Sequence, residues 1–315
     1  MTPIIEVEHL IKRYRKATKN AVDDISFSVA EGEFFALLGP NGAGKTTTIS
    51  VLTTTLAKTS GRVLIAGFDL ERDEHAIRRA SGVVFQGSCV DLNLTAEENI
   101  RFHAFLYGLY PFRPLYALMP RSYRARVHEL AELMGITAAL FQPMHTFSGG
   151  MRRKLELVRS LMHRPKVLFL DEPTAGLDPL SRRALWSYLA DIRKRERVTI
   201  LLTTHYLEEA ESADNVAIIN DGKIVTYGTP KELTRTLLGD TLIVDAVDRG
   251  SLRSALLKFT NRVSETPPFR VALSKDLRAQ DVVRSLSVEL TLFDIERPTL
   301  EDAYLKIIGS DTDAS

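Results

Sequence analysis

The sequence has few cysteines and almost no net charge. The first excludes a disulfide within the chain, and the second removes a charge-based reason to expect nucleic acid as a partner. Its single cysteine, Cys89, rules out a disulfide within the chain, which fits a reducing compartment. With 41 basic and 40 acidic residues the net charge is +1. The overall charge therefore gives no reason to expect nucleic acid as an obligate partner.

Features of membrane insertion and secretion are missing as well. No apolar run approaches the roughly 20 residues that a membrane-spanning helix needs. The first residues lack the basic start and the apolar core of a signal peptide. If the protein acts at a membrane, we therefore expect another chain to supply the membrane-spanning part.

What is present is the composition of a globular protein. Hydrophobic residues make up 44% of the 315 residues and charged residues 26%, both ordinary values. This length can bury a sizeable core. It leaves room for one large α/β domain and a small second one.

Residues 39–46 fit the phosphate-binding pattern G-x-x-x-x-G-K-[ST] at every required position. An apolar run at 34–38 enters this loop as a buried strand would, and 47–52 leaves it as the first turns of a helix. The glycines let backbone N–H groups wrap around a polyphosphate, and the helix N-terminus adds the positive end of its dipole. The predicted nucleotide-binding residues here are Gly39, Pro40, Asn41, Gly42, Ala43, Gly44, Lys45, Thr46 and Thr47. We expect Lys45 to reach the β- and γ-phosphates and the Thr46 hydroxyl to bind Mg²⁺.

Two carboxylates follow a second apolar run. Residues 166–170 are typical of a parallel strand buried on both faces, and Asp171 and Glu172 come directly after them. Asp171 can support Mg²⁺, as in other phosphate-loop ATPases, and Glu172 can orient or deprotonate the attacking water. The alternative is that the pair only opens a surface loop, which is common for a single Asp-Glu pair.

A second glycine-rich loop, Phe-Ser-Gly-Gly-Met at 147–151, precedes a predicted amphipathic helix at 152–163. Its serine and glycines form another phosphate-facing nest at a helix N-terminus. The stretch resembles the signature loop of ATP-binding-cassette (ABC) ATPases, with Phe for the usual Leu and Met for the usual Gln. The resemblance covers about residues 3–235, and the motifs occur in the family's order and spacing.

The resemblance implies roles for four further residues. Tyr14 stands where the family places an aromatic ring that stacks on adenine, although a strand aromatic in the core is the alternative. Gln86 matches the glutamine that senses Mg²⁺ and the γ-phosphate and begins the segment facing the transport partner. Asp178 matches the loop that crosses the dimer interface. His205 matches the switch histidine that contacts the γ-phosphate and steadies Glu172.

The same resemblance implies a catalytic site shared between two chains. Lys45, Gln86, Glu172 and His205 act on one side of the γ-phosphate. Ser148, Gly149 and Gly150 of a second subunit close the other side. Because the chain carries one phosphate loop and one signature loop, we expect a head-to-tail pair, most simply a homodimer, with two ATP at its interface.

The expected fold class is α/β. It is an ABC-type phosphate-loop NTPase core with a mostly parallel sheet, an antiparallel β subdomain and an α-helical subdomain, followed by a small C-terminal α/β domain. The ABC ATPase domain is placed at 1–238, with its helical subdomain at about 87–160. The C-terminal domain is placed at 239–309 and a disordered tail at 310–315.

The expected C-terminal domain alternates strands and helices after a cassette helix at 231–238, and no catalytic constellation is visible in its sequence. It is therefore interpreted as regulatory or dimer-supporting. Residues 297–305 resemble the tail of drug-resistance exporter ATPases of the daunorubicin type. The expected strands of the C-terminal domain are 241–247, 269–273 and 287–295, and its expected helices are 251–259, 277–286 and 299–308.

One segment of the helical subdomain is unusually aromatic. Residues 107–116 carry three tyrosines, one phenylalanine and two prolines. They either widen the contact with a membrane partner or form an inserted loop that packs on its own subdomain.

The sequence therefore predicts an ATPase subunit that uses ATP and Mg²⁺ to power export through a separate ABC-2-type permease. We expect it on the cytoplasmic face of the inner or plasma membrane, without nucleic acid as a partner. The alternatives are an importer ATPase, or a soluble ABC ATPase acting on ribosomes or nucleic acid. A single cassette, with only about 60 residues between Gln86 and Ser148, does not fit the two-cassette translation factors or the branch with a long coiled-coil insertion.

Overall fold

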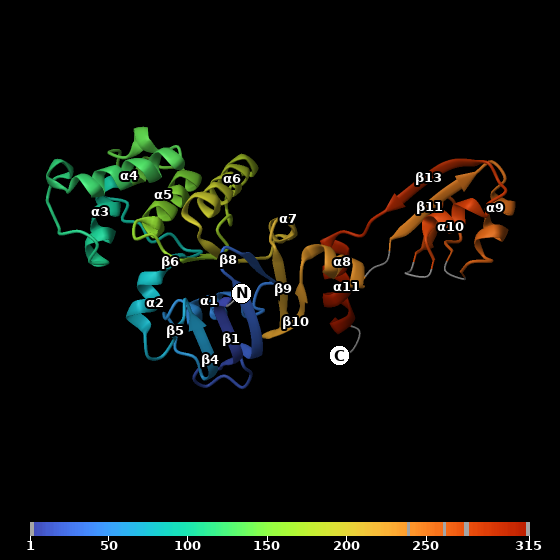
Figure 1. The fold of residues 1–315 in the computed structure, drawn as a ribbon, viewed down its shortest axis with the longest axis horizontal. Helices are drawn as coiled ribbons and strands as arrows, with labels where there is room; N and C mark the ends of the chain where they lie inside the picture. Colours follow the sequence, from blue (N-terminus) through green and yellow to red (C-terminus); the bar gives the residue numbers. More distant parts are fainter. Residues whose placement is uncertain (1–2, 238–239, 261–262, 274–276, 313–315) are drawn as a thin grey trace. The chain divides into compact units, whose positions relative to one another are not determined.

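A computed structural model describes residues 3–237, 240–260, 263–273 and 277–312. The chain separates into two compact units that divide between Thr226 and Tyr227 (Figure 1). The sequence places the boundary later, at 238 and 239, two residues that lie outside the described part. None of the helices in the described ranges is both long and apolar enough to cross a membrane.

The first unit is built around a mostly parallel six-stranded sheet in the order β10-β9-β3-β8-β7-β6. Every residue of β3, β7 and β8 is buried, because helices or other strands cover both faces of the central strands. This confirms the strands expected around the phosphate loop and before the carboxylates. The strand bounds are β3 Phe34–Leu38, β6 Ser81–Val84, β7 Val167–Asp171, β8 Thr199–Thr204, β9 Asn215–Asn220 and β10 Lys223–Gly228.

An antiparallel sheet in the order β2-β1-β4-β5 forms the expected β subdomain. Strand β1 pairs with β4, with Ile5 opposite Ile65. Apolar residues of this sheet share one core with the helix α1 (Lys45–Leu52) and with Phe35 of β3. The core therefore fixes α1 between the two sheets. The strand bounds are β1 Pro3–Lys12, β2 Val22–Ala30, β4 Ser60–Ile65 and β5 Phe68–Asp69.

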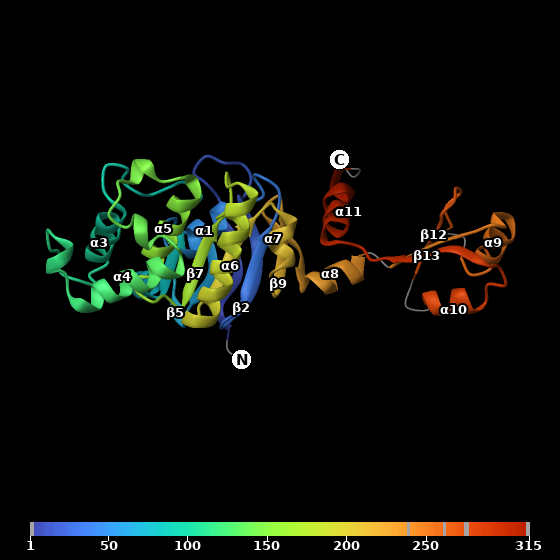
Figure 2. The same ribbon diagram turned by 90° about the horizontal axis from the view of Figure 1, so that it is seen from above.

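Three helices form the expected helical subdomain of the first unit, and both views show them close together (Figure 1, Figure 2). They are α3 (Ala96–Leu106), α4 (Arg121–Leu133) and α5 (Gly149–Leu161), with α5 packed against the other two. Helix α3 begins with a capping box between Thr95 and Glu98, which satisfies two backbone donors at its N-terminus.

The remaining helices of this unit are α2 Glu74–Ala80, α6 Pro179–Glu196 and α7 Leu207–Glu211. Single 3₁₀ turns lie at Tyr116–Leu118, Thr137–Ala139 and Met144–Thr146.

The aromatic segment 107–116 packs on its own subdomain. The rings of Tyr110 and Tyr116 meet the fully buried Tyr123 edge to face. Arg101 of α3 donates a hydrogen bond to the carbonyl of Arg113 at 2.8 Å. These contacts support the inserted-loop interpretation. A contact of this segment with a membrane partner stays a prediction.

The second unit contains an antiparallel three-stranded sheet in the order β12-β11-β13. Helices α9 and α10 share one core with alternate residues of β11, so both cover the same face of the sheet (Figure 1). The expected order of strands and helices is present in the described residues. The bounds are β11 Thr241–Ala246, α9 Arg249–Leu256, β12 Phe269–Ala272, α10 Ala279–Arg284 and β13 Leu290–Glu296.

Helices α8 (Pro230–Leu237) and α11 (Leu300–Thr312) pack against each other within the second unit. This packing explains why the compact units divide before α8, which the sequence assigns to the ATPase domain. Helix α11 also runs past the expected helix end at 308 and through 310–312 of the expected disordered tail. Residue 238, the expected last residue of the α8 helix, and residues 313–315 lie outside the described part.

His103 of α3 lies in the first unit and gives it a predictable response to acid. Burial lowers the pKa of His103 to about 3, and the nearby Arg159 and His163 act in the same direction. Its ring stacks on Tyr107, with the ring centres 4.4 Å apart. The unfolded chain takes up a proton near the ordinary pKa of about 6.5, whereas the folded chain does so only near 3. The stability contributed by neutral His103 is therefore complete above pH 6.5 and is lost as the pH falls toward 3.

We expect His103→Phe, which keeps an aromatic ring against Tyr107, to flatten this loss of stability. The measurement is the free energy of unfolding by urea at several pH values between 7 and 4. The control is His75→Phe at an exposed position of α2. Equal pH slopes for the wild type and His103→Phe would contradict the assignment.

Candidate functional site

The phosphate loop leaves the carboxyl end of β3 and leads directly into α1. Gly39 has no room for a side chain, because a Cβ there would lie 2.3 Å from the Ile219 carbonyl oxygen. Gly44 has φ 105°, and a Cβ there would lie 2.4 Å from the Ala21 carbonyl oxygen. Only glycine therefore fits at these two positions, where the loop lies against the backbone of its neighbours. No side chain in the described part of the chain caps the N-terminus of α1, so its first N–H groups are available to an anion.

Lys45 is buried at the start of α1, with 4% of its surface exposed. Its ammonium group donates to the carbonyl oxygens of Gly39 at 2.9 Å and Pro40 at 3.1 Å. It also pairs with Glu172 Oε1 at 3.3 Å. The lysine therefore joins the phosphate loop to the carboxylate that follows β7.

Asp171 ends β7 and is almost fully buried. The hydroxyl groups of Thr203 and Thr46 donate to its Oδ1 at 2.5 and 3.2 Å. Burial raises the pKa of Asp171, and these two hydrogen bonds oppose the rise. A buried carboxylate beside a hydroxyl of the phosphate loop is the arrangement expected where a divalent cation meets a phosphate.

Glu172 is held in a left-handed conformation, with φ 45°, which is uncommon for a residue other than glycine. Its N–H donates to the backbone carbonyl of Thr203 at 3.1 Å and to the Thr203 hydroxyl at 3.2 Å. Its Oε2 accepts a hydrogen bond from Gln86 Nε2 at 3.2 Å. His205 Nδ1 lies 3.3 Å from the same oxygen but is not aligned for a hydrogen bond. The structure thus brings Lys45, Gln86 and His205 together on one carboxylate.

The residues predicted to hold Mg²⁺ are Thr46, Gln86 and Asp171. They offer hydroxyl, amide and carboxylate oxygens, which suit this hard cation. In the described residues there is no cluster of three or more His, Cys, Asp or Glu side chains that could hold a metal alone. One carboxylate and one hydroxyl beside a phosphate loop fit an ion that takes its other ligands from substrate phosphates and water.

Tyr14 follows β1 and is 45% exposed, so the alternative of a buried core aromatic is wrong. Its hydroxyl lies 3.2 Å from Thr47 Oγ1 of α1. The Lys12 ammonium lies 5.6 Å from the centre of its ring. An exposed ring beside the phosphate loop is available to stack on a base, and that role stays a prediction.

The signature loop and Asp178 form a second, separate constellation. Ser148 caps α5 by accepting a hydrogen bond from Met151 N at 3.2 Å. Asp178 caps α6 in the same way and accepts from Ser181 Oγ at 2.6 Å, and these hydrogen bonds lower its pKa. A Cβ on Gly150 would lie 2.8 Å from Ser181 Oγ, so the two caps adjoin.

Both caps are exposed, since Ser148, Gly149 and Asp178 all lie on the surface. In the described part of the chain, no hydrogen bond joins them to Lys45 or Glu172. One chain therefore presents two incomplete halves of the predicted site.

Sequence reasoning missed the threonines and the glutamate that order the strand ends. The Thr203 hydroxyl donates to the Asp171 carboxylate and accepts from the Glu172 backbone N–H. Glu209 is buried and accepts hydrogen bonds from Thr204 Oγ1 at 2.6 Å and from the Thr174 hydroxyl, while burial raises its pKa. The usable signal is the pair of threonines at the end of a buried strand, where apolar residues are expected.

Comparison with known proteins agrees with this geometry. The family model described as ABC transporter matches residues 22–175. The daunorubicin resistance ATP-binding protein DrrA3 of Streptomyces coeruleorubidus is 35% identical, over 98% of this chain and 96% of that protein. The Nod factor export ATP-binding protein I of Ralstonia nicotianae is 36% identical, over 98% and 94%.

Solved structures show the same likeness. A structure of the ATP binding subunit of an ABC transporter is 31% identical with a TM-score of 0.63, over 74% of this chain and 92% of that one. The cbiO1 protein of Clostridium perfringens, titled as part of the ABC transporter complex cbiONQ, is 27% identical with a TM-score of 0.65, over 82% and 96%.

The chain therefore belongs to the ABC transporter family. It is an ATP-binding subunit of that family, an ATPase whose relatives include drug-resistance and export proteins over nearly its full length.

Thr203→Val tests how the strand end orders the two carboxylates. Valine keeps the shape but removes the hydroxyl that donates to Asp171 and accepts from Glu172 N. We expect the free energy of unfolding to fall by about 1–3 kcal/mol, the usual effect of leaving a buried group unpaired. We also expect slower ATP hydrolysis, because the Asp171 carboxylate and the backbone N–H of Glu172 both lose the Thr203 hydroxyl as a partner.

The control for Thr203→Val is Thr199→Val in the same strand, where the hydroxyl accepts from Gly32 N at 2.8 Å, away from the carboxylates. It should lower stability without changing the hydrolysis rate. Urea unfolding and a phosphate-release assay make the comparison. A Thr203→Val protein with wild-type turnover would contradict the role of Thr203.

Proposed function

We propose that the chain powers export through a separate ABC-2-type membrane permease, as one of two copies that close head to tail around two ATP. The observation that carries this proposal is the division of the predicted site. Lys45 and Glu172 meet at the phosphate loop, whereas Ser148, Gly149 and Asp178 are exposed elsewhere on the same unit. A second copy in the opposite orientation would supply the missing half of each site.

In this proposal each residue near the γ-phosphate has one task. Lys45 neutralises charge on the β- and γ-phosphates. Glu172 accepts the proton of the attacking water, held in place by Gln86 and His205. Mg²⁺ would be held by Thr46, Asp171 and Gln86, and when bound it neutralises charge on the phosphate oxygens. Hydrolysis therefore depends on position and charge rather than on a covalent intermediate.

The remaining nucleotide contacts complete the proposal. Tyr14 would stack on adenine, and the backbone of residues 39–47 would surround the phosphates. Ser148, Gly149 and Gly150 of the second copy would close over the γ-phosphate, and Asp178 would lie at the interface. ATP thus binds both copies at once, and hydrolysis releases them.

Export, rather than import, is supported by the full-length relatives. The printed names of two of them state daunorubicin resistance and Nod factor export, and both relatives align with the C-terminal unit as well as the cassette. We infer that the chain acts at the cytoplasmic face of the inner or plasma membrane, attached through its permease. The C-terminal unit is proposed to regulate the ATPase or to support the dimer.

Glu172→Gln tests the dimer and the catalytic role together. The amide cannot accept the proton of water but preserves the size of the side chain. We expect turnover to fall by about 10²–10⁴-fold, the usual contribution of a general base, while ATP binding is retained. Gel filtration with saturating Mg-ATP should then show a dimer.

The matched control for Glu172→Gln is Lys45→Ala, which should bind ATP weakly and stay monomeric under the same conditions. Calorimetry measures the binding of both variants. A Glu172→Gln protein that binds ATP and remains a monomer would sink the head-to-tail proposal while leaving the ATPase assignment in place.

The assignment to membrane transport is tested by what the trapped protein binds in its own host. Tagged Glu172→Gln should co-purify a multi-span protein of roughly six helices from detergent-solubilised membranes, identified by mass spectrometry. The control is the tagged Lys45→Ala protein. Recovery only from the soluble fraction, together with ribosomes or DNA-bound proteins, would overturn the transport assignment.

A further inference from the structure

Three side chains of one helix form hydrogen bonds with the backbone of the segment that carries Gln86. We call residues 85–89 the Gln86 segment. It follows β6 and runs past α5, whose residues Arg153, Glu156 and Arg159 all contact it. These three residues, the α5 clamp, are spaced by three and therefore lie on neighbouring turns along one side of the helix.

Arg153 binds the first half of the segment. Its guanidinium donates to the carbonyl oxygen of Phe85 at 2.6 Å and to that of Gln86 at 3.3 Å. The same group pairs with Glu156 Oε2 at 2.7 Å. A planar guanidinium with several N–H donors can satisfy these three acceptors together, whereas a lysine could not do so in the same geometry.

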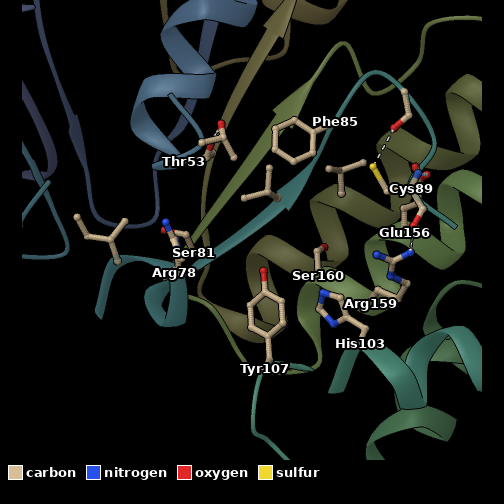
Figure 3. Close-up of a pocket in the computed structure, with 15 residues that line it drawn as sticks. Thr53, Arg78, Ser81, Phe85, Cys89, His103, Tyr107, Glu156, Arg159 and Ser160 are labelled. Atoms are coloured by element: carbon tan, nitrogen blue, oxygen red, sulfur yellow. Dashed lines mark hydrogen bonds between the residues drawn. The ribbon is translucent and has the colours of Figure 1, made fainter. Parts of the chain in front are cut away.

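Glu156 and Arg159 bind the end of the segment. Glu156 Oε1 accepts a hydrogen bond from Cys89 N at 3.2 Å, and Arg159 Nη1 donates to the Cys89 carbonyl oxygen at 2.6 Å. Figure 3 shows Cys89 beside these two side chains at the wall of a cavity of about 270 Å³. All of these contacts with the segment reach backbone atoms, so they fix its path whatever its side chains are.

Two of the three charges of the clamp, those of Arg153 and Glu156, are buried. Arg153 is 6% exposed and Glu156 is 7% exposed. A buried ion pair adds little stability compared with apolar side chains of the same size, because desolvation offsets the attraction. The other hydrogen bonds of this pair go to the backbone of the Gln86 segment, which indicates that the pair orders the segment.

The held segment presents Gln86 to the catalytic carboxylate. Its backbone carbonyl is bound by Arg153, and its side chain donates to Glu172 Oε2 at 3.2 Å. We propose that Arg153, supported by Glu156, is a positioning residue for ATP hydrolysis that acts by placing Gln86 against Glu172. This inference rests on the proposed catalytic roles of Gln86 and Glu172.

Helix α5 gives this placement a second consequence. The helix begins at Gly149 with Ser148 as its cap, and Arg153 stands five residues after the cap. At 1.5 Å per residue, Ser148 and Arg153 are about 7.5 Å apart along one continuous helix. A shift of α5 caused by a second copy at Ser148 would therefore also move the backbone anchor of Gln86.

Arg153→Met is the first test, because methionine fills similar space without donating hydrogen bonds. We expect kcat to fall by about 10- to 100-fold, the range for a displaced catalytic group. The KM for ATP should change by less than about threefold, because Arg153 contacts neither the phosphate loop nor Tyr14.

The matched control for Arg153→Met is Lys154→Met. Lys154 lies on the same helix, but its ammonium donates to Tyr188 Oη at 3.2 Å rather than to the segment. This control should retain wild-type kcat. Thermal melting of both variants checks that each is folded.

A double-mutant cycle separates positioning from a general structural effect. If Arg153 acts through Gln86, Arg153→Met should lower kcat much less in a Gln86→Ala background than in the wild type. Arg153→Lys keeps the charge and places its donors on a single nitrogen, so it should retain more of the rate than Arg153→Met. Should Arg153→Met fail to fold, Arg153→Lys and Glu156→Gln take its place in the same cycle.

Four results would overturn the inference. Three of them are wild-type kcat in folded Arg153→Met, an equal loss of kcat in the wild-type and Gln86→Ala backgrounds, and a rise in KM without a fall in kcat. If Gln86→Ala keeps full kcat while Arg153→Met loses it, Arg153 does not act through Gln86, but the ATPase and dimer proposals are untouched. The dimer proposal fails separately, by a monomeric Glu172→Gln protein.

Discussion

The buried ion pair between Lys45 and Glu172 joins two loops that leave different strands of the sheet. One loop follows β3 and the other follows β7, and the two charges meet at 3.3 Å. Such a pair adds little to stability, because removing both charges from water offsets their attraction. The pair instead fixes the positions of the Lys45 and Glu172 side chains at the phosphate loop, where a bound polyphosphate would separate the two charges. The left-handed backbone of Glu172 and its contacts with Thr203 belong to the same arrangement.

The sequence predicts this region well where the signal is local. The phosphate loop, its flanking strand and helix, and the strand before Asp171 are contiguous patterns, so the order of residues is sufficient to place them. The contacts that complete the site are not local. Thr203 meets Asp171 only because β7 and β8 pair in parallel with these two residues in register. The register between strands separated by a whole helix cannot be deduced from either strand alone.

The same distinction applies to the rest of the chain. Alternating patterns predict the strands and helices of the C-terminal unit to within a few residues. The packing of α8 against α11 joins segments some sixty residues apart in sequence, and it moves α8 into the second unit. Arg153 and Glu156 look like ordinary charged positions of a surface helix, yet both are buried. Only the folded chain shows that their partner is the backbone of another segment.

The Gln86 segment also contains the one cysteine of the chain, and Cys89 is exposed. A thiol-reactive fluorophore would therefore attach at a single position, three residues from Gln86, without the removal of any other cysteine. The emission of such a label would follow the surroundings of the segment in real time while nucleotide binds and turns over. The chain thus provides a single attachment point for a spectroscopic reporter, close to the residues predicted to act in catalysis.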